Sequence, residues 1–140
     1  MFDYIDMITT ENSKNTELYD HPLSGRVIGC AIEVHRQLGP GLLESTYEQC
    51  LAYELKLAKI GFKRQLPMPV YYKRQNLDCG YRVDLLIEDF LLVELKAVEQ
   101  VSRLHQAQIL TYMKLAETPI GLLINFNVPL LKDGIKKYIL

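Results

Sequence analysis

Cysteines are scarce and long hydrophobic runs are missing from this sequence, and both shortages exclude classes of protein. Cys30, Cys50 and Cys79 are odd in number and form no C-x-x-C pair, so we expect neither a disulfide framework nor a zinc knuckle. No stretch approaches the roughly 20 apolar residues of a membrane span, and residues 1–22 are too acidic and polar for a secretory signal. The sequence therefore predicts a soluble cytoplasmic protein without a membrane partner.

The chain also lacks an excess of charge of either sign. Its 16 basic and 17 acidic residues give a net charge of −1, so no global field indicates a nucleic-acid partner. Short basic clusters occur at residues 63–65, 71–75 and 135–138, and each alone is more typical of a solvated strand end than of a binding patch. Composition therefore leaves the substrate open.

Internal repeats and low-complexity tracts are absent as well. A length of 140 residues, with 49% hydrophobic and 24% charged content, is enough for one compact domain with a core and leaves no room for a second. Residues 1–20 are polar and lack sustained periodicity. We therefore predict a polar N-terminal arm over residues 1–20 and a single domain over residues 21–140.

Hydrophobic periodicity predicts three helices and five strands. Apolar residues recur at helical spacing from about residue 24 to 38, from 43 to 60 and from 102 to 117, and Gly61 is expected to end the second helix in the left-handed conformation. The strands are expected near residues 62–72, 80–87, 90–98, 120–126 and 134–140. The resulting order, α-α-β-β-β-α-β-β, indicates an α/β fold with a mixed sheet flanked by helices.

Three charged residues interrupt two otherwise apolar strands. Asp84 lies in "RVDLLI", and Glu94 and Lys96 lie in "LLVELKAV", where uncompensated charge is costly. Glu94 and Lys96 are two residues apart and so leave the same face of a strand. A two-residue turn would place Asp84 and Glu94 on opposite faces, whereas a three-residue loop or one bulge makes them face each other. We therefore predict an odd-length loop or a bulge between Ile87 and Leu91.

Two neighbouring carboxylates need a cation. At about 4 Å they repel by roughly 4 kcal/mol at an effective dielectric near 20, and burial adds a desolvation cost. A hard ion such as Mg²⁺ or Mn²⁺ reverses this sign, lowers the pKa of a bound water and suits phosphate-bearing substrates, and Lys96 is then placed to orient the nucleophile or stabilise the transition state. This chemistry is phosphodiester hydrolysis. Without further evidence, Glu94 and Lys96 also fit a plain ion pair at a strand end.

The segment from Asp84 to Lys96 resembles the signature of the PD-(D/E)XK nuclease superfamily, although Val83 stands where a proline usually precedes the aspartate. The stretch "GLLESTY", residues 41–47, is similar to the Gly-x-x-Glu-x-x-Tyr signature of the GxxExxY protein family, a group assigned to that superfamily. The segments "VHRQLGPGLLESTYEQCLAYEL", "YRVDLLIEDFLLVELKAVE", "HQAQILTYMKL" and "GLLINF" also resemble that family in the right order. The resemblance covers roughly residues 24–140 and implies a restriction-endonuclease-like fold.

The resemblance implies a role for four residues. Glu44, Asp84 and Glu94 would bind the metal ion, and together with Lys96 they would form the catalytic site. Glu44 by itself is also explained as a glutamate near a helix N-terminus, where the helix dipole favours it.

Three further residues are candidates for positioning the substrate. Gln108 and Tyr112 match a Q-x-x-x-Y pattern similar to that of RecB-type exonucleases, in which these side chains help to position the active site or the DNA. Being four apart on a predicted helix, they share one face, although a core tyrosine beside a solvated glutamine explains them equally well. Arg82 shares the face of Asp84 and could contact phosphate or pair with an acid. Tyr47, by contrast, is expected to pack in the core.

The sequence thus predicts a Mg²⁺- or Mn²⁺-dependent nuclease that acts on nucleic acid, with DNA as the expected substrate. Two alternatives stay open. One is a non-catalytic nucleic-acid-binding or interaction domain on the same fold, and the other is a phosphate-metabolite hydrolase, which a near-neutral net charge tolerates better than a duplex-binding surface does. The final "YIL" either finishes a strand or contacts a second subunit in a homodimer.

Overall fold

The computed structural model describes residues 21–140, so the polar arm predicted for residues 1–20 lies outside the described residues. In chain order the elements are α3 (Pro22–Leu38), α4 (Glu44–Leu57), β1 (Phe62–Pro67), β2 (Val70–Tyr72), β3 (Gln75–Leu77), β4 (Arg82–Ile87), β5 (Leu91–Lys96), α5 (Arg103–Ala116), β6 (Ile120–Asn125), a short 3-10 helix η2 (Leu131–Gly134) and β7 (Ile135–Ile139).

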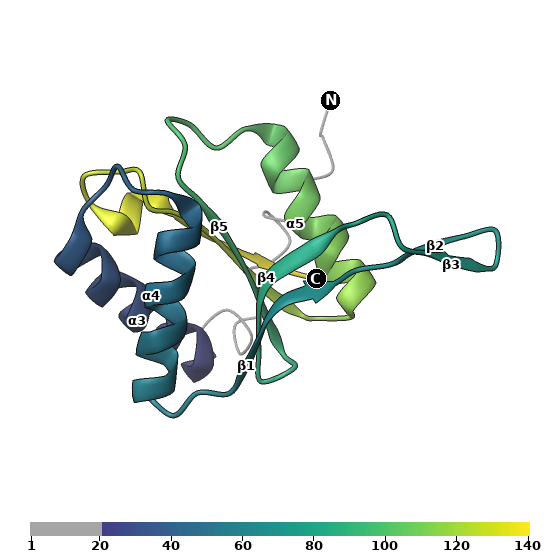
Figure 1. Ribbon diagram of the computed structural model, residues 1–140, viewed down its shortest axis with the longest axis horizontal. Coiled ribbons are helices and arrows are strands. Elements are labelled where there is room, and N and C mark those ends of the chain that lie inside the picture. Colours follow the sequence, from purple (N-terminus) through teal and green to yellow (C-terminus); the bar gives the residue numbers. More distant parts are fainter. Residues whose placement is uncertain (1–20) are drawn as a thin grey trace.

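A mixed five-stranded sheet in the order β1-β4-β5-β6-β7 forms the framework (Figure 1). Strands β5 and β6 are parallel and are joined through α5, while the other neighbouring pairs are antiparallel. The central strands carry near-continuous apolar runs because both faces of the sheet are covered. The predicted α/β class with a mixed sheet and flanking helices is confirmed.

The two faces of the sheet bury separate apolar clusters. Helices α3 and α4 pack on one face through a cluster that includes Val27, Leu51 and Val93. Helix α5 packs on the other face through Ile109 and Met113, among others. The C-terminal "YIL" belongs to this arrangement, since β7 ends at Ile139 and both Tyr138 and Ile139 are buried. No helix within residues 21–140 is both long enough and apolar enough to cross a membrane.

Helix ends follow local chemistry, with one difference from the prediction. Helix α5 begins after Ser102, whose hydroxyl accepts a hydrogen bond from the His105 amide in a reciprocal capping box. Helix α4 ends earlier than expected, and the left-handed residue after it is Lys59, with φ 59°, and not Gly61. Gly61 instead donates its amide to Glu88 at the β4–β5 loop (2.8 Å).

The loop between β4 and β5 has the predicted odd length. Ile87 pairs with Leu91, so three residues, 88–90, form the turn. Glu88 and Asp89 adopt φ values of 53° and 52°, the left-handed conformation that such a short connection requires. The register then brings Asp84 opposite Glu94 on the same side of the sheet.

The order of elements contains one hairpin, β2–β3, that the predicted order lacks. Its two strands have three residues each, and almost every residue in them is exposed. Such short strands with two solvated faces show no hydrophobic alternation, so the periodicity of the sequence carries no signal for them.

Candidate active site

Asp84 and Glu94 meet where the backbone ladder of β4 and β5 ends, one pair beyond Leu85 and Val93. The Asp84 amide donates to Glu94 Oε1 (3.1 Å), and the Leu95 amide donates to Asp84 Oδ2 (2.8 Å). Each carboxylate thus accepts a hydrogen bond from a backbone amide of the opposite strand, which in a regular ladder would donate to a backbone carbonyl. This exchange fixes both side chains next to each other at the end of the hairpin.

Burial makes this pair of carboxylates electrostatically unfavourable. The Glu94 side chain is only 7% exposed, and its burial, followed by the charge of Asp84, raises its pKa to about 8. Burial is also the largest cause of the raised pKa of Asp84. Without a compensating cation, the pair therefore retains a proton near neutral pH.

Lys96 provides part of the missing positive charge. It lies two residues after Glu94 at the end of β5, half-buried, and its ammonium lowers the pKa of both Asp84 and Glu94. Val93 and Leu95 point into the α3–α4 cluster, so the alternating residues Glu94 and Lys96 share the other face of the strand. That they share one face agrees with the prediction.

Glu44 is the first residue of α4 and is exposed. Its charge raises the pKa of the Glu94 carboxyl, more weakly than burial and the charge of Asp84 do. Within residues 21–140, no three side chains of the His, Cys, Asp and Glu types are grouped closely enough to hold a metal ion. The structure therefore brings Asp84 and Glu94 together and leaves Glu44 outside their immediate contact.

Two residues that the sequence did not single out support this pair. Glu48 is buried on α4 and accepts hydrogen bonds from Arg64 (2.8 Å) and Gln65. Gln65 also donates to Asp84 Oδ1 (3.2 Å), and its φ of 51° falls at an interruption of the β1–β4 ladder. The helical spacing of Glu44 and Glu48 is the one signal that could have indicated Glu48.

Residues from α5 and the start of β4 approach from the other side. Burial and then the charge of Glu94 raise the pKa of Tyr112, whose ring lies 6.1 Å from that of Tyr81. Gln108 is half-buried one turn before Tyr112 on the same helix. Arg82 is exposed and donates a hydrogen bond to the Tyr81 carbonyl (3.0 Å). Its guanidinium therefore lies near the connection between β3 and β4.

Tyr47 packs in the core and fastens the loop that precedes α4. Its hydroxyl donates to the Gly39 carbonyl (2.6 Å) and accepts from the Leu42 amide (3.1 Å). Its ring stacks on Phe126 with the centroids 4.4 Å apart. Tyr47 thereby sets where α4 begins, and with it the position of Glu44.

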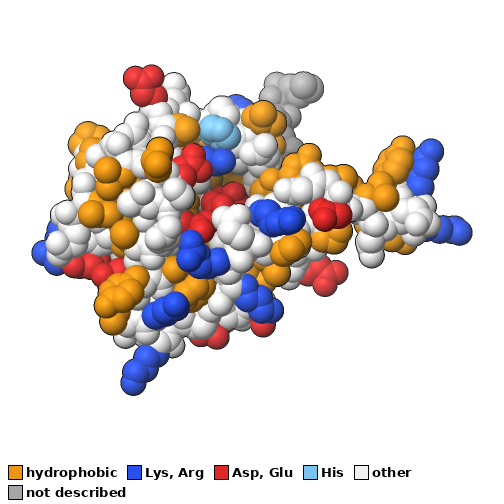
Figure 2. Space-filling model, viewed as in Figure 1, with side chains coloured by type: hydrophobic (Ala, Val, Ile, Leu, Met, Phe, Trp, Pro, Cys, Tyr) orange, Lys and Arg blue, Asp and Glu red, His pale blue; other side chains and the backbone are white. Residues whose placement is uncertain are grey.

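The surface above these residues is acidic and bordered by cations. Figure 2 shows Asp and Glu side chains gathered between α4 and α5, with Lys and Arg side chains along one side of them. Carboxylate oxygens are the donors that hard divalent ions prefer, and such an ion often takes only one or two carboxylates and keeps several waters. The pair of Asp84 and Glu94 therefore fits a divalent cation chemically.

A family model for the PD-(D/E)XK nuclease superfamily matches residues 21–138. The chain therefore belongs to this superfamily, and its fold is restriction-endonuclease-like. Members generally use divalent metals, and membership implies nucleic acid as the class of substrate. Neither the curated proteins nor the solved structures contain a match to this chain.

Tyr47→Phe should lower the free energy of unfolding by about 1–3 kcal/mol, because the two partly buried hydrogen bonds of the Tyr47 hydroxyl, to the Gly39 carbonyl and from the Leu42 amide, are both lost. Urea unfolding measures the change. Tyr53→Phe is the matched control, since Tyr53 lies on the same helix with 62% exposure and should shift stability by less than about 0.5 kcal/mol. Equal effects of the two substitutions would contradict the anchoring role of Tyr47.

Glu94 should make metal-free folding dependent on pH. Its pKa of about 8 in the folded protein lies above the ordinary 4.5, so its stabilising contribution is complete below pH 4.5 and is lost as the pH rises to 8. With a chelator, the wild type should lose roughly 2–4 kcal/mol more than Glu94→Gln between about pH 5 and about pH 9. Urea unfolding tests this, with the exposed Glu99→Gln as control. Parallel pH curves for wild type and Glu94→Gln would refute the raised pKa.

Proposed function

We propose that this protein is a metal-dependent nuclease that hydrolyses phosphodiester bonds, with DNA as its substrate. The observation that carries the proposal is the pair formed by the half-buried Asp84 and the buried Glu94, placed side by side next to Lys96 at the end of β5. A purely structural sheet has no use for two adjacent acids whose burial opposes their ionisation. A site for a divalent cation explains both their identity and their position.

In this proposal Asp84 and Glu94 hold Mg²⁺ or Mn²⁺, and Glu44, which lies outside their immediate contact at the exposed start of α4, moves in to complete the set of ligands when the ion binds. The bound ion supplies an activated water and neutralises charge on the phosphate. The Lys96 ammonium, on the same face as Glu94, would orient the attacking water and stabilise the negative charge that develops on the phosphoryl oxygens. Glu48 and Gln65 act as positioning residues, because Gln65 donates a hydrogen bond to the Asp84 carboxylate and Glu48 holds Gln65 by accepting another from it.

Substrate positioning is assigned to Gln108, Tyr112 and Arg82. The nearness of Tyr112 to Glu94 supports this for the α5 face, since the charge of Glu94 acts on the Tyr112 hydroxyl. The exposed guanidinium of Arg82 suits a phosphate group outside the metal site. The narrower assignment to the GxxExxY family rests on residues 41–47, and a cytoplasmic location and a homodimer stay predictions.

Glu94→Gln and Lys96→Ala should each reduce Mg²⁺- or Mn²⁺-dependent cleavage of DNA by at least about 10²-fold, since each removes charge that acts in the transition state. Gel assays on duplex DNA, single-stranded DNA and RNA measure this, with Glu99→Gln as the control that should cut normally. Cleavage that survives both substitutions, or that persists in a chelator, would place the activity elsewhere. Turnover of small phosphate esters with no cleavage of any nucleic acid would favour the metabolite hydrolase instead.

Glu44→Gln and Glu48→Gln should separate metal binding from support. Glu44 is exposed, so its substitution should weaken Mg²⁺ binding in calorimetry while changing stability by less than about 1 kcal/mol. Glu48 is buried and paired with Arg64, so its substitution should cost about 1–3 kcal/mol of stability even without metal. Unchanged Mg²⁺ affinity in Glu44→Gln would remove Glu44 from the ligand set.

A further inference from the structure

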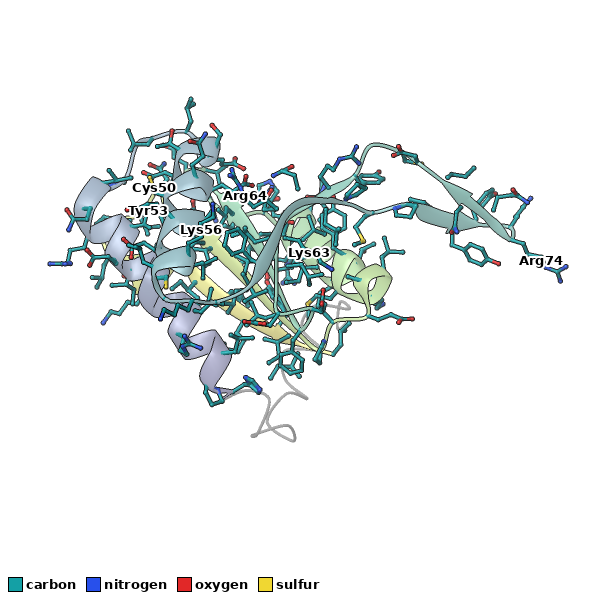
Figure 3. All side chains as sticks on the ribbon, turned by 60° about the horizontal axis from the view of Figure 1, so that its bottom comes forward. Cys50, Tyr53, Lys56, Lys63, Arg64 and Arg74 are labelled. Atoms are coloured by element: carbon teal, nitrogen blue, oxygen red, sulfur yellow. The ribbon has the colours of Figure 1, made fainter. Side chains whose placement is uncertain are left out.

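The hairpin β2–β3 stands away from the rest of the fold and ends in two cations. Within residues 21–140 it pairs with no other strand, and Figure 1 shows it projecting from the end of the molecule opposite α3 and α4. Register is regular, with Tyr72 opposite Gln75, so Lys73 and Arg74 form a two-residue turn. Figure 3 shows Arg74 at the far end of this hairpin, directed away from the body.

The composition of this hairpin is poor for stability and good for binding. An isolated two-stranded hairpin is marginally stable in water, and such turns favour Asn-Gly because both central residues need positive φ. Here the two positions are Lys73 and Arg74, with φ values of 47° and 67°. Tyr71 and Tyr72 beside them are 64% and 58% exposed. Exposed cations such as these supply the phosphate contacts on which the binding of duplex nucleic acid depends.

The charges at the tip are available to a ligand. Two cations of the preceding strand β1 are already paired: Lys63 with Asp89 at 2.9 Å and Arg64 with Glu48 at 2.8 Å. Neither Lys73 nor Arg74 has an acidic partner among residues 21–140, and the Lys73 ammonium lies 5.5 Å from the centre of the Tyr72 ring. The tip therefore offers two positive charges to a negatively charged partner.

The hairpin is connected to the active site by a short path. The chain runs from Arg74 to Asp84 in ten residues, so the tip lies at most about 35 Å from the carboxylate pair. At the base of the hairpin, Tyr81 packs against Tyr112, which lies near Glu94. A reach of about 35 Å equals about one turn of B-form DNA.

We propose that the β2–β3 hairpin is a β-ribbon that enters the major groove of duplex DNA within one helical turn of the cleaved bond. The major groove of B-form DNA, about 12 Å wide, admits a two-stranded ribbon, whereas the major groove of A-form RNA is too narrow. The ribbon therefore selects duplex DNA over duplex RNA. This inference rests on the proposed nuclease function, because it assigns a substrate to the same site.

Binding in the presence of a chelator tests the ribbon without cleavage. We would measure dissociation constants by fluorescence anisotropy for duplex DNA and duplex RNA of about 24 base pairs and for single-stranded DNA of the same length. All of these substrates would have the same sequence. The test variant is Lys73→Glu with Arg74→Glu. The control is Arg36→Glu with Lys132→Glu, which has the same net charge and alters exposed residues of α3 and η2.

The wild type should bind duplex DNA at least tenfold more tightly than duplex RNA. The tip variant should lose at least tenfold in affinity for duplex DNA, and its salt dependence should fall by roughly 2 in slope, about 0.9 for each lost phosphate contact. Its affinity for duplex RNA should change much less, and the control should match the wild type. Equal binding of DNA and RNA by the wild type, or equal behaviour of the tip variant and the control, would overturn the proposal.

Two further outcomes separate this inference from the others. If the wild type binds duplex DNA through the hairpin but cuts nothing with Mg²⁺ or Mn²⁺, the nuclease proposal fails and the ribbon stands. If the wild type cuts DNA while the tip variant binds and cuts every substrate as the control does, the ribbon fails and the nuclease stands. A tip variant that changes only the oligomeric state in sedimentation would show that the hairpin contacts a second copy, and would also overturn the ribbon.

Discussion

Two acidic side chains held side by side, Glu94 buried and Asp84 half-buried, are the constraint on which the rest of this structure depends. Asp84 and Glu94 each accept an amide of the opposite strand, so neither can move without disrupting the end of the β4–β5 hairpin. Burial holds the pKa of both groups above the ordinary range, and Lys96 only partly offsets this. The sheet thus holds an unfavourable arrangement of carboxylate oxygens, which the divalent cation of the proposed function would make favourable.

A loop at the far end of the hairpin decides whether this pair exists. Three residues, 88–90, separate the paired positions Ile87 and Leu91. Because side chains alternate along a strand, one residue more or fewer would turn Asp84 to the other face while Glu94 stayed in place. Loop residues outside the candidate site therefore determine its geometry, because an odd number of them is needed to bring Asp84 to the face of Glu94. The left-handed conformation of Glu88 and Asp89 is the local cost of that parity.

Support for the site comes from elements that are distant in the chain. Helix α4 contributes Glu48, which reaches Asp84 through Gln65 on β1. The same helix is held by Tyr47, whose ring stacks on Phe126, and the Phe126 amide donates to the Lys96 carbonyl (2.9 Å). The chain belongs to the PD-(D/E)XK nuclease superfamily, and the carboxylates of Asp84 and Glu94 lie close to Lys96. These contacts show how this particular chain keeps them in place.

The sequence by itself determined the α/β class, the central strands, the parity of the β4–β5 loop and the face shared by Glu94 and Lys96, because each follows from periodicity along one or two neighbouring segments. Only the tertiary structure revealed the β2–β3 hairpin, the left-handed turn at Lys59, and the link from Glu48 to Asp84. Short, fully solvated strands have no hydrophobic alternation to detect. Contacts between a helix and an edge strand depend on how elements pack in space, and nothing in the local sequence encodes the distance between them.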